Sequence, residues 1–294
     1  MNQTWKASLA GLLGYSIFGF SFLFSKIALD LASPSVLLSV RFLMAFLVMN
    51  LLLLTGKQHI SLRGKPVGML LLLGLVQPVL YFLFEAYGIS MTSASFSGVM
   101  IGLAPVVGLI FGVLFLKERC TLFQSVCTVL SVVGVAMTTT GGFGDIPLLG
   151  FMLLLGAVVS AALFAILSRR TAAHFSPFER TYVMFTLGSS VFTAIAFWEN
   201  RQDLAALARP MGRVAFWAAV GYLAVASSVC AFLLINYSLS HISAGRALIF
   251  SNFTTVISVL AGIFIMGDSF TVVQLAGIVI ITLSVFGVSA QKEA

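Results

Sequence analysis

The sequence predicts an all-α membrane protein with ten transmembrane helices in two inverted five-helix repeats, and with both termini in the cytoplasm. Three observations support this prediction. The 294 residues are 60% hydrophobic and only 9% charged, whereas a soluble domain carries about 25% charged residues. The apolar residues form continuous runs rather than the short alternating segments of a β-barrel. A polar sequence phrase also recurs at the ends of two of these runs.

Ten stretches are long and apolar enough to span a bilayer, since a spanning helix needs about 20 mostly apolar residues. They cover about 7–29, 35–55, 67–90, 94–116, 121–140, 147–168, 178–198, 214–238, 243–266 and 271–290. The first run is too long for a signal-peptide core and lacks a small-x-small cleavage pattern. It is therefore expected to be the first helix, and no linker is long enough to hold a soluble domain.

The basic residues indicate orientation. With a cytoplasmic N-terminus, the outer loops hold only Arg201, Arg209 and Arg213, which Glu199 and Asp203 offset. The inner loops and helix ends hold the larger group, Lys6, Lys57, Arg63, Lys65, Lys117, Arg119, Arg169, Arg170, Arg180 and Lys292. This positive-inside bias predicts a multi-pass protein of a bacterial-type plasma (inner) membrane. The net charge of +7 is thus an orientation signal, and no nucleic acid partner is expected.

The recurring phrase defines an internal repeat. "YGISMTSAS" begins at Tyr87 and "YSLSHISAG" begins at Tyr237, 150 positions later, and Glu118 falls on Asp268 at the same offset. Upstream the offset is 143, because Ser33-Pro34 matches Ser176-Pro177. The chain therefore divides into repeats at about 7–140 and 147–290. Because each repeat has five helices, an odd number, the second must be inverted relative to the first, an arrangement typical of secondary transporters.

Several stretches carry a resemblance to a known family. They are "FGFSFLFSK" (18–26), "RFLMA" (41–45), "TSASFSGVMIGLAPVVGLIFGVLFLKE" (92–118) and "ISAGRALIFSNFTTVISVLAGIFIMGD" (242–268). In this order the chain resembles the EamA-type ten-helix members of the drug/metabolite transporter (DMT) superfamily over nearly its whole length. The resemblance implies a carrier, commonly an exporter, that works without ATP hydrolysis, with a central cavity bounded by helices 1, 3, 4, 6, 8 and 9. Helix 4 has the family-like Pro105, but its counterpart is Thr255, so no matching kink is expected in helix 9.

Ionisable side chains inside a bilayer are costly and are functional candidates. Lys26, Arg41 and Glu85 are expected roughly 5–10 Å inside the outer ends of helices 1, 2 and 3, given a rise of about 1.5 Å per residue. Two interpretations remain open. Glu85 pairs with Arg41 or Lys26 to neutralise structural charges, or it faces a cavity and couples transport to protons.

A polar stripe on helix 3 favours the cavity. Gln77, Tyr81 and Glu85 are spaced i, i+4, i+8 and share one helix face. Pro78 within this stripe is expected to loosen one helical turn. A polar stripe that faced lipid would be expensive, so it must face protein or a water-filled cavity.

Four further side chains are candidate substrate contacts, two amides that both donate and accept and two aromatic walls: Asn236, Asn252, Tyr15 and Tyr237. A stripe of small residues on helix 9 is interpreted instead as close helix packing: Ser251, Thr254, Ser258 and Gly262. Single aromatics among 27 phenylalanines are interpreted as core.

These residues predict a secondary transporter that exports a small amphipathic metabolite by alternating access. Amino acids or related compounds are the leading substrate class, because Arg41 or Lys26 could meet a carboxylate while Glu85 meets an ammonium. The alternatives are a cationic or aromatic drug efflux carrier and a non-transporting receptor or scaffold. The sequence has no metal-ligand spacing or phosphate loop, so no enzyme, metal or cofactor is expected. The sequence leaves the oligomeric state open between monomer and homodimer.

Overall fold

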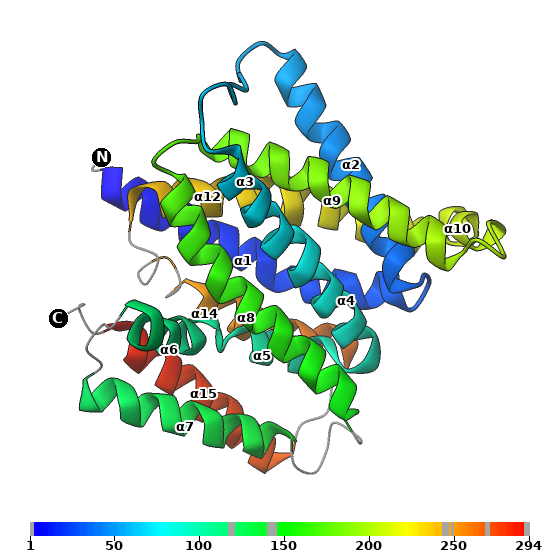
Figure 1. Cartoon of the computed structure of the whole chain (residues 1–294). Coiled ribbons are helices and arrows are strands. Elements are labelled where there is room, and N and C mark those ends of the chain that lie inside the picture. The colour runs from blue at the N-terminus through cyan, green and yellow to red at the C-terminus, as the bar shows by residue number, and fades with distance from the viewer. Residues whose placement is uncertain are drawn as a thin grey trace.

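The computed structural model describes residues 3–116, 121–139, 146–242, 247, 250–267 and 271–290, and Figure 1 shows their arrangement. The elements of the first half are α1 (Gln3–Leu29), α2 (Pro34–Leu54), α3 (Val67–Gly74), η1 (Leu75–Leu80), α4 (Tyr81–Met91), α5 (Ala94–Ile101), α6 (Ala104–Leu116) and α7 (Leu122–Thr139). The elements of the second half are α8 (Leu148–Thr171), α9 (Pro177–Glu199), α10 (Ala205–Ala208), η2 (Arg209–Gly212), α11 (Val214–Gly221), η3 (Tyr222–Cys230), α12 (Ala231–His241), α14 (Ser251–Ala261), η4 (Gly262–Met266) and α15 (Val272–Ala290).

The structure is a bundle of apolar helices, as the composition predicts. Seven helices among the described residues are long and apolar enough to cross a membrane: Gln3–Leu29, Pro34–Leu54, Val67–Met91, Ala94–Phe111, Leu148–Thr171, Pro177–Glu199 and Val214–His241. Three further apolar helices are shorter over the described residues: Ser125–Gly134, Phe253–Met266 and Val272–Ser284. The count of ten spans and the inversion of the repeats stay predictions.

Two of the spanning segments are interrupted beside a proline. Gln77, with φ −144° and ψ 116°, breaks the helix between α3 and α4, next to Pro78. Gly102 and Leu103 separate α5 from α6, and Pro105 follows. Proline causes such breaks because it lacks a backbone N–H and its ring collides with the preceding turn. The predicted loosening at Pro78 is confirmed, and α14 runs without a break through Thr255, as its residue type predicts.

Helix α1 lies in the middle of the bundle and packs against α12, α14, α11 and α5. The helices α7 and α15 pack along each other and lie together at one edge of the view in Figure 1. Helix α1 begins and α15 ends on the same side of that view. This placement supports the prediction that both termini lie on one side of the membrane.

One inner charge is buried rather than in a loop. Arg180, which the sequence places among the cytoplasmic basic residues, is 0% exposed. Its guanidinium donates to the main-chain oxygens of Ser168 at 2.7 Å and Asn236 at 2.6 Å, and to the hydroxyl of Ser240. These groups lie near the C-terminal ends of α8 and α12, where the negative end of each helix dipole attracts a cation. Arg180 therefore joins α8, α9 and α12 instead of facing the cytoplasm.

Candidate functional site: a central cavity between six helical segments

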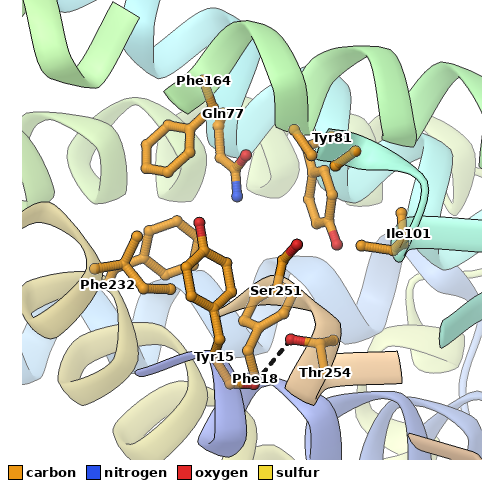
Figure 2. Close-up of a pocket in the computed structure, with 12 residues that line it drawn as sticks. Tyr15, Phe18, Gln77, Tyr81, Ile101, Phe164, Phe232, Ser251 and Thr254 are labelled. Carbon is orange, nitrogen blue, oxygen red and sulfur yellow. Dashed lines mark hydrogen bonds between the residues drawn. The ribbon is translucent and has the colours of Figure 1, made fainter. Parts of the chain in front are cut away.

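A cavity lies in the middle of the bundle, and Figure 2 shows its lining. The lining comes from the six predicted helical segments 1, 3, 4, 6, 8 and 9, so it matches the helix set that the family resemblance implies. Its residues are Tyr15, Phe18, Gln77, Tyr81, Ile101, Ala104, Ala161, Phe164, Phe232, Ile235, Ser251 and Thr254. None of these twelve residues carries a formal charge.

The break beside Pro78 puts the Gln77 side chain in this cavity. The Gln77 side chain is 4% exposed, and its Oε1 has no hydrogen-bond partner. Figure 2 shows its amide pointing into the space between Tyr15 and Tyr81. A buried carbonyl oxygen without a partner costs about 1–3 kcal/mol. A ligand that donates a hydrogen bond to Gln77 would remove this cost.

The Tyr81 hydroxyl connects the cavity to Glu85. Tyr81 lines the cavity, and its hydroxyl donates to Glu85 Oε1 at 3.0 Å. Glu85 is 1% exposed and is not among the lining residues. The predicted stripe therefore has two parts: Gln77 and Tyr81 line the cavity, and Glu85 lies outside the lining, bound to the Tyr81 hydroxyl.

Aromatic rings form most of the remaining wall. Phe18 lies edge-on to Phe232, with ring centroids 5.9 Å apart, and Phe164 lies edge-on to Phe232 at 5.8 Å. Tyr15 also lines the cavity, and its carbonyl oxygen accepts a hydrogen bond from Thr254 at 2.9 Å. The cavity volume is about 30 Å³, whereas binding sites for small molecules have volumes of about 300–1,000 Å³. The helices must move apart before the cavity can hold a metabolite.

Arg41 is buried outside the cavity lining, within electrostatic range of Glu85 and Tyr81. Its Nε donates to Ser228 Oγ at 3.0 Å, and its Nη2 donates to Ser227 Oγ at 3.2 Å. Its guanidinium carbon also lies 4.3 Å from the centre of the Phe82 ring, a cation–π contact. Arg41 is 1% exposed, and these contacts fix α2 to η3.

Lys26 lies near the end of α1, apart from Glu85. Its Nζ donates to the carbonyl oxygen of Thr92 at 3.3 Å and lies 3.9 Å from Asp30 Oδ1. The ion pairs within 4.0 Å in the described part of the chain are Lys26–Asp30, Lys65–Glu179 and Arg209–Asp203. Glu85 makes no ion pair within 4.0 Å with Arg41 or Lys26 in the described part of the chain, but Arg41 and Glu85 lie close enough to interact electrostatically, so both interpretations stay open.

The structure places two of the predicted contacts away from the cavity. Asn236 is fully buried: its Oδ1 accepts from Ser168 at 2.7 Å, and its Nδ2 donates to Thr181 at 3.0 Å. Tyr237 lies against His241, with ring centroids 4.4 Å apart. The reason is helical geometry, because Ile235 faces the cavity and the next two residues point about 100° and 200° away from it. The Asn252 side chain lies outside the described residues.

Sequence reasoning missed most of the wall. Phe18, Phe164 and Phe232 carried no signal, because nothing distinguishes a cavity phenylalanine from a core one in so apolar a chain. Ser251 and Thr254 were interpreted as packing residues. Thr254 does pack, through its bond to α1, but both residues also line the cavity.

A multi-span helical bundle with a buried, partly polar cavity between its helices is the architecture of a membrane carrier. The comparisons with known proteins agree. The chain belongs to the EamA-like transporter family, whose model matches residues 5–140 and again residues 148–290. The protein is therefore a multi-pass membrane transporter rather than an enzyme.

Its relatives are transporters as well. The uncharacterized transporter YcxC of Bacillus subtilis (strain 168) is 34% identical over 297 residues, which cover 99% of this chain and 95% of the relative. An uncharacterized transporter of Archaeoglobus fulgidus is 24% identical over 274 residues, covering 93% and 95%. One solved crystal structure aligns with a TM-score of 0.70 at 17% sequence identity over 97% of this chain and 98% of its own. That likeness shows the fold alone.

Proposed function

We propose that this transporter is a secondary carrier with ten transmembrane helices in two inverted repeats, residues 7–140 and 147–290, and that it exports a small amphipathic metabolite by alternating access. The single observation that carries the proposal is the unpartnered Gln77 oxygen, buried in a cavity that six helical segments line. The two matches of one family model, one in each half of the chain, support the repeat boundaries. The distribution of basic residues supports the plasma membrane and cytoplasmic termini.

The lining limits the substrate. Phenyl rings favour an apolar or aromatic body, and Gln77 with the Tyr15 and Tyr81 hydroxyls favours one polar end. Amino acids with large apolar side chains, or related compounds, satisfy both requirements. Glu85 would act on the ammonium group through Tyr81, and Arg41 would have to release Ser227 and Ser228 before it could meet a carboxylate.

A second candidate is a cationic aromatic compound. The electron-rich faces of Phe18, Phe164 and Phe232 attract cations, and no lining residue opposes a positive charge. This candidate needs the Glu85 carboxylate behind Tyr81 but makes no use of Arg41.

The Tyr81–Glu85 pair offers a way to couple transport to protons. An ionised Glu85 accepts a hydrogen bond from the Tyr81 hydroxyl. The lone pairs of the Tyr81 oxygen can then accept a hydrogen bond from a substrate ammonium. A protonated Glu85 can donate to Tyr81 instead, and the Tyr81 proton then points elsewhere. Proton binding and substrate binding thus compete without direct contact between Glu85 and the substrate.

The test is counterflow in proteoliposomes with zwitterionic, cationic and anionic solutes of matched size. Zwitterionic solutes with apolar side chains are expected to exchange fastest, and dominant flux of cationic aromatics would favour the second candidate. In Gln77→Leu the affinity should fall about tenfold, since one hydrogen bond of about 1.4 kcal/mol is lost. Its melting temperature should not fall, because the oxygen that is removed has no partner in the protein.

The matched control is Gln202→Leu, which makes the same change in an exposed position of the segment before α10. This variant should transport like the wild type. Wild-type affinity in Gln77→Leu would remove the cavity from the transport path. An absence of counterflow for every solute in a well-folded sample would contradict the carrier proposal.

A further inference from the structure

A second, larger pocket lies between the end of α2, the start of α9 and α12. Its volume is about 490 Å³. That is within the usual range of small-molecule sites, about 300–1,000 Å³, and far above the 30 Å³ of the central cavity. The two pockets share no lining residue.

The pocket opens where the helices leave the apolar part of the bundle. Helix α2 ends at Leu54, and the basic segment that carries Lys57 follows. Leu51 and Leu54 in the last turns of α2 are 63% and 81% exposed, which is expected of side chains that face lipid tails. These features support a position of the pocket mouth at the boundary between lipid tails and headgroups, on the side that the basic residues indicate as cytoplasmic.

The nearest negative charge is already neutralised. Glu179, in the first turn of α9, accepts from Lys65 at 2.8 and 3.1 Å and from the main-chain N–H groups of Ser61 and Ser176. Lys57 lines the pocket and is exposed, and no described carboxylate lies within 4.0 Å of its ammonium. The polar end of the pocket therefore has a positive charge to offer to an external anion.

The walls of the pocket divide into two kinds. Lys57, Gln58 and Tyr237 supply polar side chains, and Leu52, Phe178 and Leu233 supply apolar ones. A free anion would use only the first set. A molecule with an anionic head and a hydrocarbon tail would use both.

We infer that this pocket binds an anionic phospholipid of the basic-side leaflet, with its phosphate on Lys57 and one acyl chain along Leu52, Phe178 and Leu233. Basic pockets between transmembrane helices on the cytoplasmic side suit such headgroups. The lipid would touch α2, α9 and α12 together, so its binding should stabilise their packing. This inference goes beyond the proposed transport function and does not depend on the transported substrate.

The experiment measures lipid binding to the full chain in detergent. Native mass spectrometry counts the bound lipids, and thermal melting follows stability, as phosphatidylglycerol, phosphatidylcholine or glycerol phosphate is added. Phosphatidylglycerol should bind and raise the melting temperature, and the other two should do so weakly or not at all. Lys57→Gln should weaken phosphatidylglycerol binding about fivefold, the effect of one lysine beside an anionic headgroup.

Two further variants separate this site from general charge effects. Arg63→Gln removes an exposed positive charge from the same segment but lies outside the pocket lining, so it should bind like the wild type. Leu233→Trp fills the apolar wall and should also weaken binding. The inference is wrong if Lys57→Gln and Arg63→Gln behave alike, or if phosphatidylcholine stabilises as well as phosphatidylglycerol. A full effect from glycerol phosphate alone would show a soluble-anion site and would overturn the lipid assignment.

Discussion

Among the described residues, the guanidinium groups of Arg41 and Arg180 are buried, and the chain supplies the polar partners that water would otherwise provide. Arg41 has two serine hydroxyls and an aromatic face. Arg180 has two main-chain oxygens and the hydroxyls of Ser168 and Ser240. A charge in a bilayer is costly unless such partners are present. Both residues therefore act as crosslinks between helices, and neither is among the residues that line the central cavity.

The Arg180 crosslink predicts a large stability effect. Arg180→Ala deletes the guanidinium hydrogen bonds that join α9 to α8 and α12, and hydrogen bonds to a charged group contribute about 1.5–3 kcal/mol each. The free energy of unfolding in detergent should fall by roughly 3 kcal/mol, measured by thermal or chemical denaturation. Arg170→Ala is the control, because Arg170 is exposed at the same end of α8. Equal stability of the two variants would show that Arg180 contributes no net stabilisation.

The Tyr81–Glu85 bond predicts a pH effect. If Glu85 controls the cavity through Tyr81, affinity for an ammonium-bearing substrate should fall as the pH drops. A protonated Glu85 donates a hydrogen bond to the Tyr81 oxygen instead of accepting one, so this oxygen is less available to the substrate ammonium. Both Glu85→Gln and Tyr81→Phe should abolish this pH dependence, measured as counterflow affinity at two pH values. A direct contact between Glu85 and substrate predicts instead that Tyr81→Phe keeps the pH dependence. Unchanged pH dependence in a well-folded Glu85→Gln would remove Glu85 from coupling.

At the scale of elements, α5 and α14 pack closely through small residues, as the stripe on helix 9 predicts. Ser258 Oγ donates to the carbonyl oxygen of Ala94 at 3.0 Å, and Thr255 Oγ1 donates to that of Gly98 at 3.1 Å. A Cβ added at Gly98 would collide with the Ser258 side chain. Small residues thus let the two backbones approach closely enough for side chain to main chain hydrogen bonds.

This contact predicts a rescue experiment. Gly98→Ala should destabilise the protein by about 1–3 kcal/mol through overpacking. The double variant Gly98→Ala/Ser258→Gly removes the side chain that the new methyl group would meet. It should recover part of the lost stability, as measured by thermal melting. Gly221→Ala serves as the control, since its new methyl group would meet nothing within 4 Å, and the helix should gain roughly 0.5–1 kcal/mol. Destabilisation that the second change does not relieve would contradict the close-packing interpretation.

The elements were predictable where one residue type dictates the backbone. Pro78 and Pro105 anticipated the two interrupted segments, and the segment 214–238 anticipated the helical run Val214–His241. The wide helical turns of η3 had no such signal, because no proline lies within Tyr222–Cys230 and its packing partners come from α1 and α2. Asn236 was misplaced for a related reason. Its polarity suggested a ligand, but only the assembled fold supplies Ser168 and Thr181 as partners.

At the scale of the whole molecule, the arrangement of charge predicts which side of the membrane each loop faces. Lys65 and Arg170 should face the cytoplasm, and Arg209 and Asp145 should face outside, although Asp145 lies beyond the described residues. The structure supports a common side for the first pair: Lys65 contacts Glu179 at the start of α9, and Arg170 lies in the last turn of α8, just before it. Arg209 lies beyond the far end of α9, bound to Asp203.

Single cysteines at these four positions test the prediction with a membrane-impermeant thiol reagent. The native cysteines are first replaced: Cys120, Cys127 and Cys230. In intact cells only the cysteines at positions 145 and 209 should be labelled, and permeabilised cells should label all four, which controls for accessibility. Figure 1 shows α8 and α9 running in opposite directions, so labelling at both 170 and 209 in intact cells would mean that α9 does not cross the bilayer. Labelling at 65 would place the first-half loop outside and would overturn the predicted orientation. Labelling at 65 but not at 170 would put these two loops on opposite sides and would overturn the inverted repeat as well, because the inversion depends on five crossings per half.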